Sequence, residues 1–178
     1  MIEIKTTGLA ELKTVYRDLP DKIKRRVITR AAKGAANVYL AEARRVAPVR
    51  ATPMRGRNKR PAGTLKRALI VKRARELNTA TSTGFLVTVL RGKKFQRVGK
   101  RGINKDAFYA NWVHDGHRVV PRRSKSNQGG ITARRRGAAG RVEGNPFLLN
   151  AFESASTRAL DKFSETMQVI LANPSALK

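Results

Sequence analysis

Two long segments with apolar residues at helical spacing, one near each end of the chain, constrain the fold most strongly. The first runs from about Asp21 to Val46 and is expected to end before Pro48, because the residue preceding a proline avoids helical backbone angles. The second opens with Asn145 as a candidate N-cap and Pro146 at the first helical position, and Pro174 closes it. Both segments are predicted to be amphipathic helices that pack on each other or on a shared sheet.

The apolar stripes of these two helices differ in side-chain size. The middle of the first stripe is made of small residues, among them Ala31, Gly34 and Ala35, which let a second helix approach closely. The second helix is expected to bury one stripe, formed by Leu148, Phe152, Ala155, Ala159, Phe163, Met167 and Ile170. Truncation of Leu148 or Phe152 is therefore expected to remove core packing.

Segments with strand character lie between the helices. The best strand candidates are "TLKRALIVKRARE" (64–76) and "TGFLVTVLRGK" (83–93), with "ATSTG" (80–84) as a turn between them. "MIEIK" at the start suits a short edge strand, and "GLAELKTVYRDL" (8–19) suits a short helix. Seven residues are too few for periodicity to decide whether "AFYANWV" (107–113) is a strand or a short helix.

The predicted fold class follows from this order of elements. We expect an α+β fold in which a small antiparallel β-sheet packs with a long N-terminal helix and a long C-terminal helix, with extended basic loops. At 178 residues, the chain 1–178 is expected to form a single domain.

The positive charge of the chain is concentrated in two blocks. The formal net charge is +27, from 39 Lys and Arg against 12 Asp and Glu. Between residues 43 and 105 there are 19 basic residues and one carboxylate, Glu76, and between residues 116 and 142 there are eight basic residues and no acid. Such an excess favours a polyanion or an acidic protein surface as a partner.

Two stretches inside these blocks, 50–62 and 118–144, are predicted to be basic flexible insertions or arms. They have too few apolar residues to fold alone, so they either become ordered against a partner or remain solvated loops. The residues expected to contact a partner or DNA are Arg50, Arg55, Arg57, Lys59, Arg60, Arg122, Arg123, Arg134, Arg135 and Arg136.

The sequence carries no pattern typical of an enzyme. It has no Cys, no H-E-x-x-H, no phosphate-binding loop and no nucleophile elbow. His114, Asp115 and His117 are close in sequence, but their spacing suggests no third ligand for a metal. We therefore expect no catalytic residue, no cofactor and no metal site. No apolar run reaches the length of a membrane span and the start does not resemble a signal peptide, so we expect a protein of the cytoplasm without a membrane partner.

Four short motifs resemble those of one protein family. "ARRVAPV" followed by "AGTLKRALIV" looks like P-x-x-T-G-x-L-x-x-S-I, with Pro48, Gly63, Leu65 and Leu69 in the matching positions. "YANWVHDGH" resembles aromatic-A-x-x-V-E-x-G-T, and "NPFLLNAF" resembles P-F-L-x-P-A. In this order, with a helix at each end, they resemble the neck or tail-completion proteins of long-tailed bacteriophages, which are related to the minor tail component Z of phage lambda.

The chain departs from this family pattern in four places. About a dozen residues from Arg50 to Pro61 look inserted, His114 stands where the family has Glu, and His117 stands where it has Thr. The loop from Arg118 to Gly144 is long and basic. Contacts that the family makes through that Glu therefore do not carry over to this chain.

The resemblance implies a function. It implies a structural protein of the virion that joins tail to head as a ring, typically a hexamer, around the DNA channel, and that is in the host cytoplasm during assembly. The implied partners are further copies of the chain, a head-closure protein, a tail terminator or tail tube and a tape measure protein, with contact to genomic DNA. It also favours packing or turn roles for Tyr109, Trp112, Gly116, Pro146 and Phe147.

A free basic nucleic-acid-binding protein is the alternative. The basic arms contain almost no aromatic residues that could stack on bases, and neither long helix has the features of a recognition helix. The formation of rings would distinguish the neck protein from this alternative.

Overall fold

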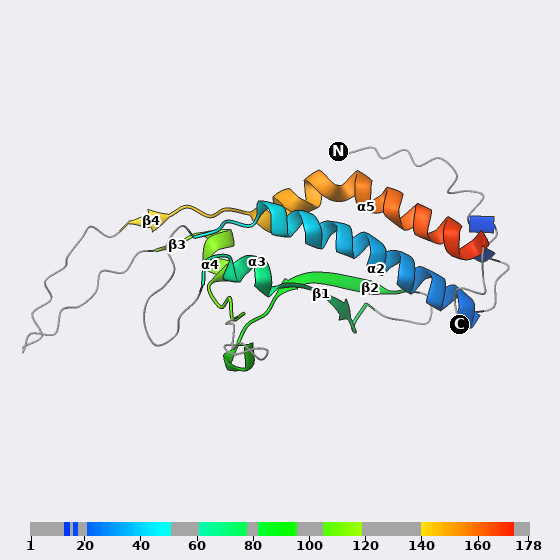
Figure 1. Cartoon of the computed structure of the whole chain (residues 1–178), viewed down its shortest axis with the longest axis horizontal. Coiled ribbons are helices and arrows are strands. Elements are labelled where there is room, and N and C mark those ends of the chain that lie inside the picture. The colour runs from blue at the N-terminus through cyan, green and yellow to red at the C-terminus, as the bar shows by residue number, and fades with distance from the viewer. Residues whose placement is uncertain are drawn as a thin grey trace, which may run out of the picture. The chain divides into compact units, whose positions relative to one another are not determined.

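The structure of the chain is a computed structural model, and it describes residues 13–14, 16–17, 21–50, 61–77, 82–95, 105–118 and 140–172 (Figure 1). It divides into two compact units, which are treated separately below: unit 1 comprises residues 1–107 and 147–178, and unit 2 comprises residues 108–146. That the whole chain forms a single domain stays a prediction.

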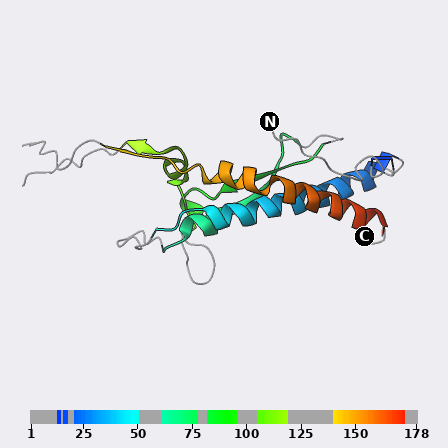
Figure 2. The same cartoon turned by 90° about the horizontal axis from the view of Figure 1, so that it is seen from above.

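Unit 1 is built on two long antiparallel helices, α2 (Asp21–Val46) and α5 (Phe147–Ala172). Figures 1 and 2 show them side by side, with their chain directions opposed. The predicted bounds of α2 are confirmed, whereas α5 begins one residue after Pro146, the residue predicted to open it. An Asp in the first turn of α2 and two Arg in its last turn complement the helix dipole.

The small residues of α2 set the closeness of this helix pair, as the sequence predicts. Ala31 on α2 and Ala155 on α5 are each 0% exposed. A methyl group added at Gly34 would lie 3.3 Å from Thr166 Oγ1 on α5. Larger residues pack beside this contact, where Val27 and Ala31 form a buried cluster with Met167 and Ile170.

A two-stranded antiparallel sheet packs on α2 (Figure 1). It consists of β1 (Leu69–Ala74) and β2 (Gly84–Val89), with Leu69 opposite Val89 and Ala74 opposite Gly84. The predicted α+β class, with a small antiparallel sheet packed with two long helices, is confirmed.

The first predicted strand is shorter than expected. Residues Thr64–Ala68 form a short helix, α3, and only the following residues form β1. Gly63, with φ 74° in the left-handed region, occupies the N-cap of α3, a conformation that glycine adopts without a steric penalty. Thr64 Oγ1 donates a hydrogen bond to the carbonyl oxygen of Pro61 at 2.7 Å, which favours a helical turn here over an extended strand.

The apolar face of α5 differs in part from the predicted stripe. Phe147 is 0% exposed and Ala151 is buried, whereas Phe152 is 57% exposed and Leu148 is only partly buried. The prediction that Phe152 belongs to the core is therefore wrong. Its ring instead stacks on Tyr39 of α2, with ring centroids 5.0 Å apart. The close approach of α2 leaves room in the contact for Ala151 and Ala155 but not for a phenyl ring.

Unit 2 is a short helix followed by a two-residue β-ladder. For residues 107–113 the sequence did not decide between a strand and a short helix, and the structure has the helix α4 (Ala110–Asp115) there. The strand β3 (His117–Arg118) pairs with β4 (Arg141–Val142). Two glycines let the backbones touch: a Cβ on Gly116 would lie 2.5 Å from Val142 O, and one on Gly144 would lie 2.5 Å from His114 O. Gly116 has φ 78°, so the glycine turn predicted at this position is present.

Four predicted segments lie wholly or largely outside the described residues, and two of them are the basic arms 50–62 and 118–144. The strand "MIEIK" lies outside them, and of the short helix predicted over residues 8–19 only Lys13, Thr14, Tyr16 and Arg17 are described, all of them helical.

Candidate anion-binding groove

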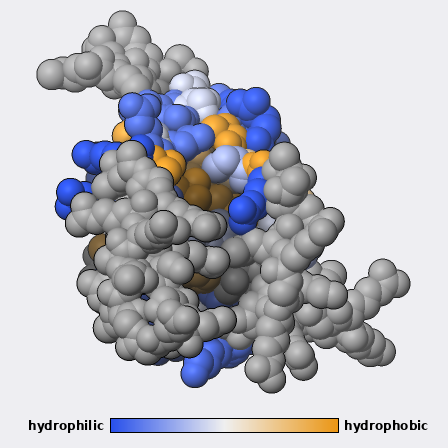
Figure 3. Space-filling model, turned by 90° about the vertical axis from the view of Figure 1, so that its left-hand side faces the viewer, coloured by the Kyte–Doolittle hydropathy of each residue, from blue (hydrophilic) through white to orange (hydrophobic). Residues whose placement is uncertain are grey.

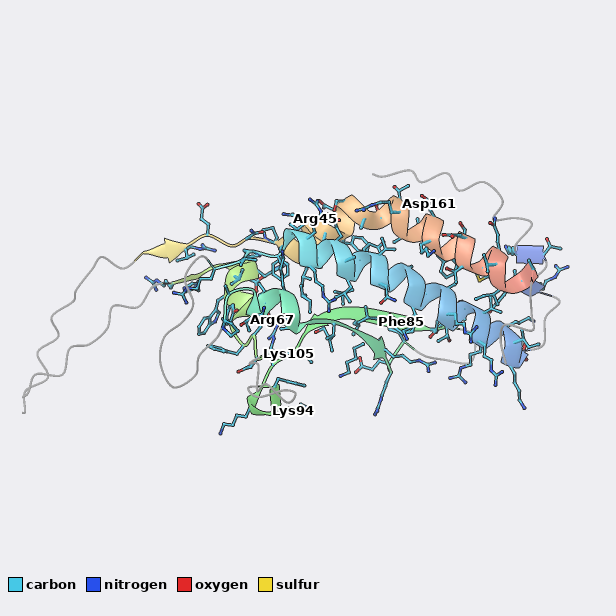
Figure 4. The ribbon with its side chains drawn as sticks, in the orientation of Figure 1. Arg45, Arg67, Phe85, Lys94, Lys105 and Asp161 are labelled. Carbon is cyan, nitrogen blue, oxygen red and sulfur yellow. The ribbon has the colours of Figure 1, made fainter. Side chains whose placement is uncertain are left out.

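Unit 1 carries an open groove of about 490 Å³ that we call the basic groove. Its lining comes from three segments that are distant in sequence: the last turns of α2, helix α3 and residue 105. The lining residues are Ala41, Arg44, Arg45, Lys66, Arg67 and Lys105. Figure 4 shows Arg45, Arg67 and Lys105 towards the same end of α2.

Backbone carbonyl groups hold two of the arginines in place. Arg44 Nη2 donates to the carbonyl oxygen of Leu69 at 2.8 Å, where α3 passes into β1. Arg67 Nη2 donates to the carbonyl oxygen of Ala62 at 2.6 Å, across the tight turn at Gly63. A guanidinium has five N–H donors in a planar fork, so each side chain is oriented while other donors remain for an anion.

Backbone hydrogen bonds of residues 105 and 107 hold Lys105 at the groove. Its N–H donates to the carbonyl oxygen of Phe95 at 2.8 Å, and two residues later the N–H of Ala107 donates to the carbonyl oxygen of Leu90 at 3.0 Å. Between them, the buried Asp106 accepts a hydrogen bond from the N–H of Gly92 at 3.0 Å. These bonds attach the segment beside the end of β2 and fix where Lys105 emerges.

Arg45 is the one groove cation with a carboxylate partner among the described residues. Glu42, 4% exposed on α2, accepts from Arg45 Nη2 at 2.6 Å and from Arg158 Nη2 of α5 at 3.0 Å. Ser154 Oγ on α5 donates to the same carboxylate at 3.2 Å. Hydrogen bonds from Arg45 and then from Arg158 hold the pKa of Glu42 at about 2, well below its usual value of 4.5. Glu42 thus links α2 to α5 through charge-assisted hydrogen bonds.

The lowered pKa of Glu42 predicts a pH dependence of stability. The unfolded chain takes up this proton near pH 4.5 and the folded chain only near pH 2, so the free energy of unfolding should fall as the pH drops through this window. Above that window the stabilisation is complete. Thermal midpoints of the wild type and of Glu42→Gln, measured by circular dichroism across the window, should converge towards the acid end. A constant difference between the two proteins at every pH would contradict the assignment.

A second groove of unit 1, which we call the apolar groove, has a volume of about 260 Å³. It lies between α2, β2 and α5 and is lined by Ala36, Tyr39, Ala43, Phe85, Leu86, Val87, Leu148, Ala151 and Phe152. Leu86 is 50% exposed and Phe152 57% exposed, so two large apolar side chains face solvent at its rim. Figure 3 shows one side of the molecule, where hydrophobic residues lie next to hydrophilic ones among the coloured residues.

Most of the residues predicted to contact a partner lie outside the described residues. Of that set, only Arg50 is described; it is exposed and follows the C-terminal end of α2. The nine others are Arg55, Arg57, Lys59, Arg60, Arg122, Arg123, Arg134, Arg135 and Arg136. Arg50 is not among the lining residues of the basic groove.

The predicted packing residues of unit 2 form an aromatic group that is largely open to solvent. Trp112 is 52% exposed, and its ring lies 5.5 Å from that of Phe108 and 5.8 Å from that of His117, between centroids. Tyr109 is partly buried and packs edge-on against Phe108 at 5.7 Å. Pro146, in the same unit, is exposed, whereas Phe147, which opens α5 in unit 1, is fully buried.

The histidines of unit 2 have no metal-binding geometry within the described ranges. His114 Nδ1 lies 2.8 Å from Asp115 Oδ1, and no group of three or more His, Asp or Glu side chains in the described part of the chain is arranged to hold a metal ion. Over the same residues, no helix has the length and apolar character needed to cross a membrane.

Sequence reasoning missed the basic groove because its cations are ordinary surface residues when seen one at a time. One signal was present: the two stretches that together resemble a family motif contain no acid but four cations, Arg44, Arg45, Lys66 and Arg67. The tertiary structure adds Lys105, which is far from the others in the chain.

Comparisons with protein-family models, curated proteins and solved structures found no match to this chain.

Proposed function

We propose that this protein is a structural component of the neck of a long-tailed bacteriophage, a ring-forming tail-completion protein that joins tail to head around the DNA channel. The order of the four sequence motifs supports this proposal, as does the α+β scaffold bounded by two long helices. Its partners would be further copies of the chain and neighbouring neck and tail proteins.

The apolar groove is the observation that carries the proposal. A ring subunit needs a surface that a neighbouring protein can cover, and exposed apolar patches with aromatic residues are typical of such contacts. Phe152, stacked on Tyr39 and still 57% exposed, is an aromatic anchor of the kind that dominates binding energy at interfaces. Phe85 and Val87 of β2 extend the same apolar surface.

The charge of the chain predicts when rings should form. A formal charge of +27 on each subunit opposes ring closure, so the purified protein should be monomeric or loosely associated at low ionic strength. Salt or duplex DNA should shift it towards closed rings, as measured by native mass spectrometry and negative-stain electron microscopy.

Variants of exposed apolar residues on α5 test the role of the apolar groove. Phe152→Asp should abolish the rings, whereas Val169→Asp should retain them, because Val169 is 62% exposed but lies outside the apolar groove. Circular dichroism should confirm that both variants fold. Equal behaviour of the two variants, a closed ring at low ionic strength without a partner, or monomers under every condition would contradict the proposal.

A free nucleic-acid-binding protein remains the second candidate function, and the basic groove is the observation that favours it. Tight DNA binding by a chain that stays monomeric at all salt concentrations would support this second function over the first.

A further inference from the structure

We propose that the basic groove binds the phosphate backbone of double-stranded DNA without reading its base sequence. This inference rests on the proposed neck function in one respect, because that function identifies the DNA as the phage genome in the channel. The ligand itself is inferred from the chemistry of the groove.

The first argument is charge. Of the six described residues that line the groove, five are Lys or Arg, and none is acidic. Within the described residues, Arg45 pairs with Glu42, but no carboxylate forms an ion pair with Arg44, Arg67 or the two lysines of the groove. Like charges held around one concave surface repel one another, and an anion bound among them removes that repulsion.

The second argument is preorganisation. Three of the cations are arginines, and the structure orients each of them: Arg44 and Arg67 by backbone carbonyl groups, and Arg45 by the buried carboxylate of Glu42. Side chains that are already ordered lose less entropy when they bind. Arginine forks oriented in this way can bond phosphate oxygens in a bidentate manner.

The third argument distinguishes phosphate from other anionic partners. Among the described residues that line the groove, Ala41 is the only apolar one, so this part of the lining lacks the apolar core that a protein interface requires. The described lining also has no aromatic residue on which the bases of a single strand could stack. Contacts made by Lys and Arg alone are backbone contacts, which position a duplex but carry no sequence information.

Fluorescence anisotropy with a labelled duplex tests the proposal, with the full-length chain titrated over a range of salt concentrations. The groove variant is Lys66→Gln with Lys105→Gln, because neither side chain makes a hydrogen bond or ion pair with another described residue. Loss of two phosphate contacts should lower the slope of log affinity against log salt by about 1.8 and weaken binding on the order of tenfold or more at moderate salt. A second duplex of unrelated sequence should behave in the same way.

The matched control is Lys22→Gln with Lys33→Gln, which removes the same charge from exposed positions on α2 outside the basic groove. This control should keep the salt slope of the wild type. An unchanged slope in the groove variant, or equal losses in both double variants, would overturn the proposal. So would poly-glutamate that binds as tightly as DNA and loses as much affinity in the groove variant, since that result would assign the groove to an acidic protein surface.

Light scattering on the same samples separates this inference from the proposed function. Groove-dependent DNA binding by a permanent monomer would support the inference and contradict the neck role. Rings whose DNA binding does not depend on the groove would support the neck role and contradict the inference.

Discussion

Replacement of Phe147 by alanine is expected to lower the free energy of unfolding by about 3–5 kcal/mol, the range found when a buried phenyl ring is truncated. Phe147 is 0% exposed and belongs to the largest fully buried side chains of the described residues. The first turn of α5 has little room to collapse around the cavity, because its backbone is tied into a long helix packed on α2. Urea denaturation followed by far-UV circular dichroism measures the loss.

Phe152→Ala provides the matched comparison on the same helix. Its ring is 57% exposed, so truncation loses mainly the stack on Tyr39 and should lower stability by only about 1 kcal/mol. The same substitution should have its main effect on assembly through the apolar groove. Equal losses of stability for Phe147→Ala and Phe152→Ala would show that the burial assigned to these two rings is wrong.

Replacement of Ala31 by leucine is expected to destabilise the fold by about 1–3 kcal/mol through overpacking. Ala31 is 0% exposed and faces α5, where even a methyl group at the nearby Gly34 would lie 3.3 Å from Thr166 Oγ1. The added side chain would force the two long helices apart along much of their contact. Thermal and urea denaturation of the variant measure the effect.

Lys33→Leu serves as the control for this substitution. It places the same leucine at an exposed position of the same helix, so stability should change by no more than about 0.5 kcal/mol. If Ala31→Leu were as stable as the wild type, the helices would not be held together by small residues at this point.

The proposed function requires contact with neighbouring proteins and contact with DNA, and unit 1 has one groove suited to each. The apolar groove between α2, β2 and α5 offers a surface for a neighbouring protein, and the basic groove at the end of α2 offers one for a polyanion. Because they share no lining residue, variants of one should leave the other intact. Ring formation and DNA binding can therefore be tested independently.

Local sequence signals determined the two long helices and the class of the fold. The apolar periodicity from Asp21 to Val46, with Pro48 after it, predicted α2 with its observed bounds, because helical spacing and the restriction before proline act over a few residues. The small residues around Ala31 likewise predicted a close helix contact. The predicted strands overlap β1 and β2, although Thr64 at the turn after Gly63 begins a helix instead of a strand.

Only the tertiary structure decided which face of α5 is buried and where the cations gather. Two stripes of α5 share Ala155, Ala159, Met167 and Ile170, so helical spacing alone could not choose between Phe147 and Phe152 as the core aromatic residue. In the folded chain Phe147 is fully buried, whereas the Phe152 ring stacks on Tyr39 of α2 and stays 57% exposed. The basic groove depends on packing in the same way: it unites α2, α3 and residue 105, and the backbone hydrogen bonds that bring them together have no signature in the local sequence.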